Sequence, residues 1–345
     1  MPNDVLTAAI DALATRRDLS QEQAGEVLAE IMAGNGSDAQ IAAFLIALRT
    51  KGETVEEIAG LATAMRALAI PVPTRRDDLL DTAGTGGGRR TFNVSTTAAL
   101  VAAGAGCAVA KHGNRSATGL SGSADVLEAL GARIDLAPAD VGRCIDDVGF
   151  GFMFAPAHHA ATRHVIPARR ELAVRTIFNF LGPLTNPAGA RRQVVGVSDA
   201  AYIEALAGAL AHLGCDRALV VSSADGLDEM STSAPTHVVE VNGDELRRYE
   251  VAPADVGLAE APAAAISSGD PAANAATARA VFDGRQGADA DLVLLNAGAA
   301  IYAAGRVADL KSGVELARET IASGAAVRAL DEYVRISGEL APKTA

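Results

Sequence analysis

The sequence predicts an α/β protein with a small N-terminal helical domain, residues 1–70, and a larger domain, residues 75–345, that contains a mainly parallel sheet flanked by helices. Two patterns support this prediction. The first 70 residues carry clear helix-start signals, and from Leu79 onward short apolar runs alternate with helix-like segments. At 345 residues the chain also exceeds the usual size of one core, so we expect two domains.

The N-terminal region is predicted to form helices because three residue pairs fit the capping box. These pairs are Ser20 with Gln23, Ser37 with Gln40, and Thr54 with Glu57. Gly34 and Gly52 act as stops. Two apolar faces follow helical spacing, one made of Ile41, Phe44, Leu45 and Leu48 and the other of Ile58, Leu61, Met65 and Leu68. A bundle this small cannot bury all of its apolar surface, so we expect the remainder to form a dimer interface.

After a linker with two prolines at 71–78, the larger domain is predicted to contain six parallel-type strands. Their ranges are 79–83, 107–110, 132–136, 150–154, 193–197 and 218–221. A β-hairpin is expected over 236–251, turning at Asn242-Gly243. Residues 156–181 interrupt the alternation of strands and helices. Ligand-binding loops are expected at the carboxyl ends of the parallel strands.

Two loops in this domain have the composition of anion sites. Gly84-Thr85-Gly86-Gly87-Gly88 lets backbone N–H groups approach an anion, and the helix starting near Ser95 directs its positive end toward the same point. Lys111-His112-Gly113-Asn114-Arg115 and Ser121-Gly122-Ser123 repeat this arrangement before the helix at 124–130. A glycine loop alone fits an ordinary tight turn equally well. Together, the two loops indicate a ligand phosphorylated at both ends.

Composition excludes several classes of function. The chain has 30 Lys and Arg against 42 Asp and Glu, a net charge of −12 and a pI near 5.0, which argue against general binding of nucleic acid or membrane surfaces. A phosphorylated substrate must then meet local cations or a metal ion. Three single cysteines without metal-ligand spacing, and no signal-like N-terminus, predict a cytoplasmic protein with reduced thiols. No apolar run is long enough to span a bilayer.

Six motifs in order carry a resemblance to a known family. They are GTGG at 84–87, TFNVST at 91–96, KHGNR at 111–115, SGSADVLEALG at 121–131, the segment 154–187, and DGLDE at 225–229. With them the chain closely resembles the anthranilate phosphoribosyltransferases, which join anthranilate to 5-phosphoribosyl 1-diphosphate (PRPP) in tryptophan biosynthesis. The resemblance implies the nucleoside phosphorylase/phosphoribosyltransferase class of fold, a homodimer formed through the helical domain, and return of helices from about 156–181 to that domain, so that the active cleft lies between domains.

The resemblance also implies the residues that bind PRPP. From the first loop they are Gly84, Thr85, Gly86, Gly87, Gly88, Thr91, Asn93, Val94, Ser95 and Thr96. From the second they are Lys111, His112, Gly113, Asn114, Arg115, Ser116, Ala117, Thr118, Gly119 and Ser123. Lys111 is expected to act electrostatically, and no residue is assigned as nucleophile or base. Taken alone, Asn93, Ser95 and Thr96 would be interpreted as helix caps, and Lys111 as a solvated residue after a strand.

Metal and acceptor sites follow from the same resemblance. Ser95, Asp228 and Glu229 are expected to bind Mg²⁺, two ions per subunit, since adjacent carboxylates and a hydroxyl offer the oxygen ligands that Mg²⁺ prefers. An Asp-Glu pair in a loop is otherwise ordinary surface charge. Anthranilate is expected to contact Gly84, Asn114, His159 and Arg169, whose guanidinium suits a carboxylate. Arg170 is the structural alternative, pairing with an acid on its own helix.

The chain departs from the family pattern in the first loop. The family has an aspartate after GTGG and four residues before the TFN-like triplet, whereas this chain has three, Gly88, Arg89 and Arg90. We hypothesise that Arg89 or Arg90 contacts the diphosphate directly. The alternative is that both arginines are solvated. In the second loop, Thr118 and Gly119 stand where the family often has two serines.

The predicted reaction is displacement of diphosphate from C1 of PRPP by the anthranilate amine, without a covalent enzyme intermediate. Three other interpretations stand beside it. A pyrimidine nucleoside phosphorylase shares the architecture, but its lysine-glycine signature is absent from this sequence. A paralogue that uses another aromatic acceptor is compatible with the altered loop. A non-catalytic nucleic-acid-binding relative is disfavoured by Asn114, Arg169, the Asp228-Glu229 pair and the acidic pI.

Overall fold

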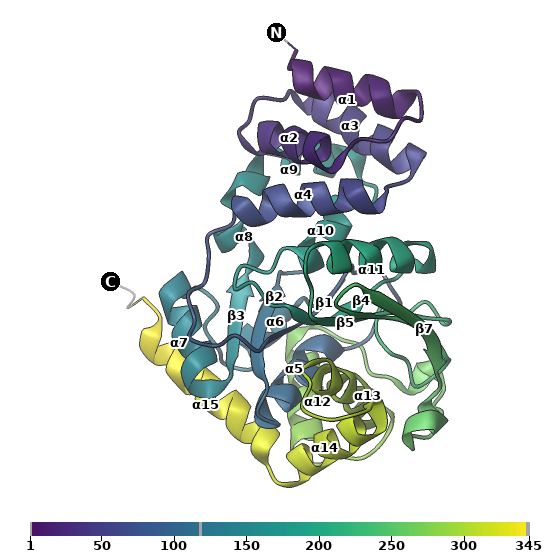
Figure 1. The fold of residues 1–345 in the computed structure, drawn as a ribbon. Coiled ribbons are helices and arrows are strands. Elements are labelled where there is room, and N and C mark those ends of the chain that lie inside the picture. The colour runs from purple at the N-terminus through teal and green to yellow at the C-terminus, as the bar shows by residue number, and fades with distance from the viewer. Residues whose placement is uncertain (1, 117–118, 343–345) are drawn as a thin grey trace.

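A computed structural model describes residues 2–116 and 119–342 and has a helical bundle stacked on an α/β domain (Figure 1). The bundle contains α1 (Asp4–Ala14), α2 (Gln21–Met32), α3 (Asp38–Lys51) and α4 (Val55–Ala67). The 3-10 helix η1 (Ala160–His164) packs on α2, and α9 (Ile166–Leu172) packs on α3. Segments distant in sequence therefore complete the bundle.

The bundle helices begin largely as their caps predict. Ser20 and Thr54 form complete capping boxes. The third box is half formed: Ser37 accepts the N–H of Gln40, but the side-chain oxygen of Gln40 accepts the N–H of Asn3 instead. The predicted face of α4 is wrong at its last position, because the helix ends at Ala67 and leaves Leu68 48% exposed.

The α/β domain contains one seven-stranded sheet in the order β3-β2-β1-β4-β5-β6-β7. Its parallel strands are β1 (Leu79–Gly84), β2 (Ala108–Gly113), β3 (Phe150–Phe154), β4 (Arg192–Gly196) and β5 (Arg217–Ser223). The antiparallel pair β6 (Thr236–Asn242) and β7 (Glu245–Val251) is the predicted hairpin, with Gly243 at φ +59° in its turn. The predicted fold class is therefore confirmed.

One predicted strand, 132–136, is wrong. Ala132, Ile134 and Leu136 are buried in alternation, which produces the period-two pattern in the sequence. The backbone N–H groups find other partners, however: Ala132 donates to Leu127 at the end of α6 (Ser123–Ala129), and Arg133 donates to the hydroxyl of Ser337. The segment alternates between buried and more exposed residues, but no strand among the described residues pairs with it.

Helices cover both faces of the sheet. Most of the domain's remaining helices share one core with β1–β3: α5 (Val94–Gly104), α6, α7 (Pro138–Val148), α12 (Pro271–Phe282), α13 (Ala288–Ala303), α14 (Leu310–Ala322) and α15 (Ala325–Leu340). On the other face, α10 (Phe178–Leu184) and α11 (Ile203–His212) share a core with the helical bundle. Val194 and Val195 on β4 belong to opposite cores, as the alternation of side chains along a strand requires.

This topology places the loops after β1, β2 and β5 at one edge of the sheet, where the carboxyl ends of the parallel strands meet. The loops after β1 and β2 are the two predicted anion loops, and the loop after β5 carries Asp228 and Glu229. In the part of the chain that the structure describes, every helix is too short or too polar to cross a bilayer.

We predict that Gly60→Ala destabilises the bundle. A Cβ at Gly60 would lie 2.1 Å from the carbonyl oxygen of Gln21, where α4 crosses the start of α2, so the helices would have to separate. Overpacking of this kind costs about 1–3 kcal/mol. The matched control is Gly338→Ala in α15, where a Cβ would meet nothing within 4 Å apart from the backbone of its own helix, and alanine there is expected to raise stability by about 0.5–1 kcal/mol. Urea unfolding of both variants measures the difference, and equal free energies of unfolding would contradict it.

Candidate active site

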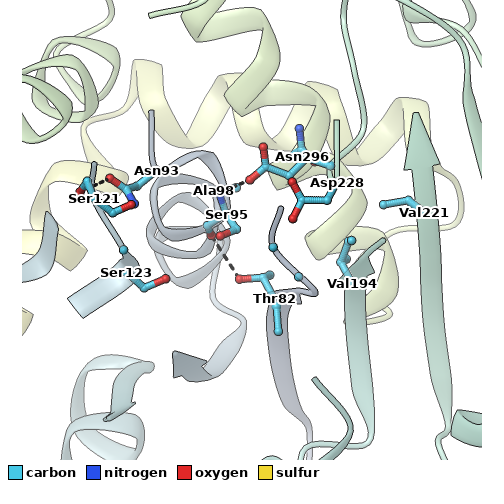
Figure 2. Close-up of a pocket in the computed structure, with 16 residues that line it drawn as sticks. Thr82, Asn93, Ser95, Ala98, Ser121, Ser123, Val194, Val221, Asp228 and Asn296 are labelled. Carbon is cyan, nitrogen blue, oxygen red and sulfur yellow. Dashed lines mark hydrogen bonds between the residues drawn. The ribbon is translucent and has the colours of Figure 1, made fainter. Parts of the chain in front are cut away.

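A cavity of about 210 Å³ lies at the carboxyl ends of β1, β4 and β5 (Figure 2). Both predicted anion loops and the loop after β5 line it. The predicted site residues on its wall are Gly84, Gly86, Asn93, Ser95, Ser123, Asp228 and Glu229. Ser121 of the second predicted loop also lines it, and Thr82 and Asn296, which were not predicted, complete its polar surface. The structure thus brings together residues from three loops that are far apart in the sequence.

The glycine loop meets two different physical demands. Gly86 and Gly87 have φ +65° and +83°, a region that glycine adopts without strain. Gly84 and Gly88 instead allow close approach, because a Cβ at these positions would lie 3.1 Å and 2.5 Å from the carboxylate oxygens of Asp228. The loop therefore packs directly against the proposed metal ligand.

The remaining predicted residues of the first loop support this arrangement. Thr85 donates its N–H to the carbonyl of Gly196 at the end of β4. The Thr91 hydroxyl lies 3.4 Å from the Glu229 carboxylate, and the N–H of Ser95 donates to the same carboxylate at 3.2 Å. Val94 and Thr96 are buried in the first turn of α5.

Asn93 occupies the N-cap position of α5, but its side chain makes no capping hydrogen bond, so that interpretation is wrong for the side chain. Its side-chain amide donates to the carbonyl of Ser121, and its side-chain oxygen accepts from the hydroxyl of Ser121 at 2.8 Å and from Asn274 at 3.0 Å. Figure 2 shows the Asn93–Ser121 pair at one side of the cavity. Asn93 therefore ties the first loop to the second.

Lys111 is buried, so its interpretation as a solvated residue is wrong. Its ammonium donates to the carbonyl and hydroxyl of Thr82, and it lies 3.4 Å from the hydroxyl of Ser95. Burial lowers the pKa of Lys111 to about 8, against the opposing effect of the Asp81 and Glu229 charges. The Lys111 ammonium thus lies directly behind Thr82 and Ser95, which line the cavity.

Sequence reasoning missed Asp81, a fully buried carboxylate on β1. It accepts the N–H of His112 at 3.1 Å and the side-chain amide of Asn186 at 2.7 Å. Burial raises the pKa of Asp81 to about 6, while the nearby Lys111 charge opposes the shift. An acid inside an apolar strand was the signal that could have identified it.

In the second loop, Arg115 and Ser116 make contacts within the protein. Arg115 donates hydrogen bonds to Asp125 and Glu128. Both bonds raise the pKa of Arg115, and the bond to Glu128 has the larger effect. The hydroxyl of Ser116 accepts the N–H of Gly119. Asn114 is exposed, and Gly113 lies where a Cβ would meet the ring of Phe152. Ala117 and Thr118 lie outside the described residues.

The donor set at Asp228 and Glu229 fits Mg²⁺. Burial by the surrounding protein raises the pKa of both carboxyls, and the neighbouring Asp228 charge also raises that of Glu229, which reaches about 8. Two close carboxylates beside a cavity, with the Ser95 hydroxyl between the loops, are hard oxygen donors that a divalent cation would stabilise. Within the described residues no three acidic, His or Cys side chains gather as a metal cluster.

Two of the predicted acceptor residues, His159 and Arg169, lie in the segment between β3 and α10, whereas Gly84 and Asn114 lie in the two loops. His112 and His159 approach with ring centroids 5.1 Å apart, and burial lowers their pKa values to about 3 and about 4, so both are neutral at pH 7. Arg169 is half-buried over the ring of Phe178, and the described chain provides no acidic partner for it. Arg170 is exposed and makes no ion pair with the described acids of its own helix.

The two loop arginines have different environments. Arg89 donates to Asp225 at 3.0 Å and to the carbonyl of Ala263, so its charge is already paired. Arg90 is exposed, and none of the described acids pairs with it. Arg90 is therefore the better candidate for a direct contact with diphosphate.

Comparisons with known proteins agree with this geometry. Residues 76–327 match the family model described as "Glycosyl transferase family, a/b domain", and residues 7–69 match "Glycosyl transferase family, helical bundle domain". The chain is 51% identical over 341 residues to anthranilate phosphoribosyltransferase of Symbiobacterium thermophilum, covering 99% of this chain and 100% of that protein. It is 50% identical over 343 residues to that of Rubrobacter xylanophilus, with the same coverage.

Solved structures give the same result. The enzyme from Thermus thermophilus is 48% identical, superposes with a TM-score of 0.91, and covers 96% of this chain and 99% of its own. The enzyme from Saccharomyces cerevisiae, in complex with PRPP and Mg, is 28% identical with a TM-score of 0.88 and covers 97% of this chain and 98% of its own. A further yeast structure contains 4-fluoroanthranilate. The chain therefore belongs to the anthranilate phosphoribosyltransferase family of glycosyltransferases.

Proposed function

We propose that this protein transfers the phosphoribosyl group of PRPP to the amine of anthranilate, giving N-(5-phosphoribosyl)anthranilate and diphosphate in tryptophan biosynthesis. One observation carries the proposal: Gly84, Gly86, Ser95 and the Asp228-Glu229 pair converge on a single cavity with the N-terminus of α5. Backbone N–H groups, a helix dipole and carboxylates for Mg²⁺ together suit a diphosphate leaving group.

The protein's residues act by position and charge. The glycine-loop amides and the Lys111 ammonium favour the negative charge that develops on the leaving diphosphate as the C1–O bond breaks. Mg²⁺, when bound, supplies further positive charge to the diphosphate oxygens. The Arg169 guanidinium would hold the anthranilate carboxylate, with Asn114, His159 and Gly84 beside it. Because the aromatic amine is already nucleophilic, the reaction needs no strong base.

We propose that Ser95, Asp228 and Glu229 hold the metal, with two ions per subunit. The support is the chemistry of the donors: these oxygen-bearing side chains line one cavity, and a cation bound there would favour the charged form of the two carboxyls, whose pKa burial raises. The other expected PRPP contacts from the two loops remain part of this proposal.

We further propose a cytoplasmic homodimer formed through the helical domain. Val5 on α1 is exposed and lines a groove with Ala8, Ala12 and Leu19, and Asp4, Gln23 and Glu26 also line this groove. The free thiols of Cys107, Cys144 and Cys215 are buried, which suits a reducing compartment. Sedimentation should give twice the chain mass of 35.0 kDa, whereas a monomer at micromolar concentration would refute the dimer.

The activity predicts that anthranilate fluorescence disappears when PRPP and Mg²⁺ are added together. Asp228→Asn and Glu229→Gln keep the shape of each side chain but remove a metal-binding charge, so we expect kcat/KM for PRPP to fall at least 100-fold. Glu245→Gln on the edge strand β7 is the matched control and should retain full activity. Normal turnover by either site variant would refute the metal role, and persistent fluorescence with the wild type would refute the activity.

Arg90→Ala is expected to raise KM for PRPP about tenfold, the effect of losing one charge-assisted hydrogen bond. Arg90→Lys keeps the charge and should lose less. Arg89→Ala is the comparison, because it breaks the ion pair with Asp225 and should lower thermal stability as well. If KM for PRPP is unchanged in Arg90→Ala, Arg90 does not contact the diphosphate.

A further inference from the structure

Arg175 makes contacts that no predicted role explains. It lies in the connection between α9 and α10, where the chain returns from the helical bundle to the sheet. Its guanidinium donates to two backbone carbonyls of the glycine loop, that of Gly86 at 2.5 Å and that of Thr85 at 3.2 Å. The guanidinium also lies over the ring of Phe180, which stacks on Tyr202.

From these contacts we propose that Arg175 is a positioning residue, which aims the amides of the glycine loop and links that loop to the helical bundle. The inference rests on the proposed function, because it assigns the loop amides to the diphosphate of PRPP. Arg175 itself is not assigned a contact with substrate.

The geometry of the peptide unit supports the first half of the proposal. In a trans peptide the C=O and the next N–H point in opposite directions, and the described chain contains no cis bond. A guanidinium that holds the carbonyls of Thr85 and Gly86 therefore turns the N–H groups of Gly86 and Gly87 away from itself. Gly86 itself lines the cavity, together with Asp228.

The glycine loop leaves room for the Arg175 guanidinium. A Cβ at Gly87 would lie 1.9 Å from Nη1 of Arg175, so any side chain there would displace the guanidinium. The hydroxyl of Ser198 donates to the same Gly86 carbonyl at 2.9 Å. Two donors from different segments thus fix one peptide plane.

A second set of contacts links Arg175 to the bundle. The side chain of Arg49 on α3 donates to the carbonyl of Arg175 at 2.9 Å, and α3 packs on α9. Arg169, the proposed partner of the anthranilate carboxylate, lies on α9 only six residues earlier. The helix proposed to hold the acceptor and the loop proposed to hold the donor are therefore joined through one short segment.

Arg175→Ala tests the proposal. We expect kcat/KM for PRPP to fall 10- to 100-fold while KM for anthranilate changes less than twofold, and we expect the Kd of Mg²⁺-diphosphate, measured by calorimetry, to rise about tenfold. The matched control is Arg170→Ala, which removes an exposed arginine from the neighbouring helix and should leave all three values unchanged. Thermal unfolding checks that each variant is folded.

Arg175→Lys separates position from charge, because lysine keeps the charge but cannot hold both carbonyls in a fixed fork. An intermediate Kd is expected, and full recovery would assign the effect to charge and overturn the positioning role. PRPP kinetics and diphosphate affinity within twofold of wild type in Arg175→Ala would also overturn it. If the wild type consumes no anthranilate, the proposed function fails, whereas the diphosphate measurement still tests Arg175.

Discussion

The site depends on close approach of three backbone segments to Asp228. Gly84 ends β1, Gly88 lies in the following loop and Gly196 ends β4, and a Cβ at any of them would press on Asp228, at Gly196 as near as 1.7 Å from its carbonyl oxygen. Without those side chains, the loop after β5 can lie across the edge of the sheet. This contact brings a carboxylate and the glycine-loop amides to the same cavity.

Buried charge is the second consequence of that packing. Asp81, Lys111, Asp228 and Glu229 are all buried, and burial shifts the pKa of each in the direction that favours its neutral form. Such charges cost folding free energy unless they are paired or meet a ligand. The proposed binding of a metal ion and a diphosphate would provide the partners that these buried groups lack within the protein.

Local features of the fold could be predicted from sequence because they depend on neighbours in the chain. The capping boxes at Ser20 and Thr54 and the turn at Gly243 are of this kind. The segment 132–136 was predicted wrongly because alternating burial does not reveal whether a partner strand exists. Within the site, the motifs identified which loops converge, but not the partners of Asn93, Arg89 or Arg115, since those partners lie on other segments.

Arg175 shows most clearly what a sequence pattern leaves out. Its partners are backbone carbonyls 89 and 90 positions away, so neither a motif nor a charge pattern points to the contact. The glycine at 87 is required both by its φ of +83° and by the guanidinium that occupies the place of its Cβ. Glycine at position 87 thus meets a local requirement, the positive φ, and a long-range one, the space that the Arg175 guanidinium needs. Only the folded structure shows that the two requirements are separate. The connection between α9 and α10 is consequently part of the glycine loop's structure, and it joins that loop to the helical bundle through Arg49.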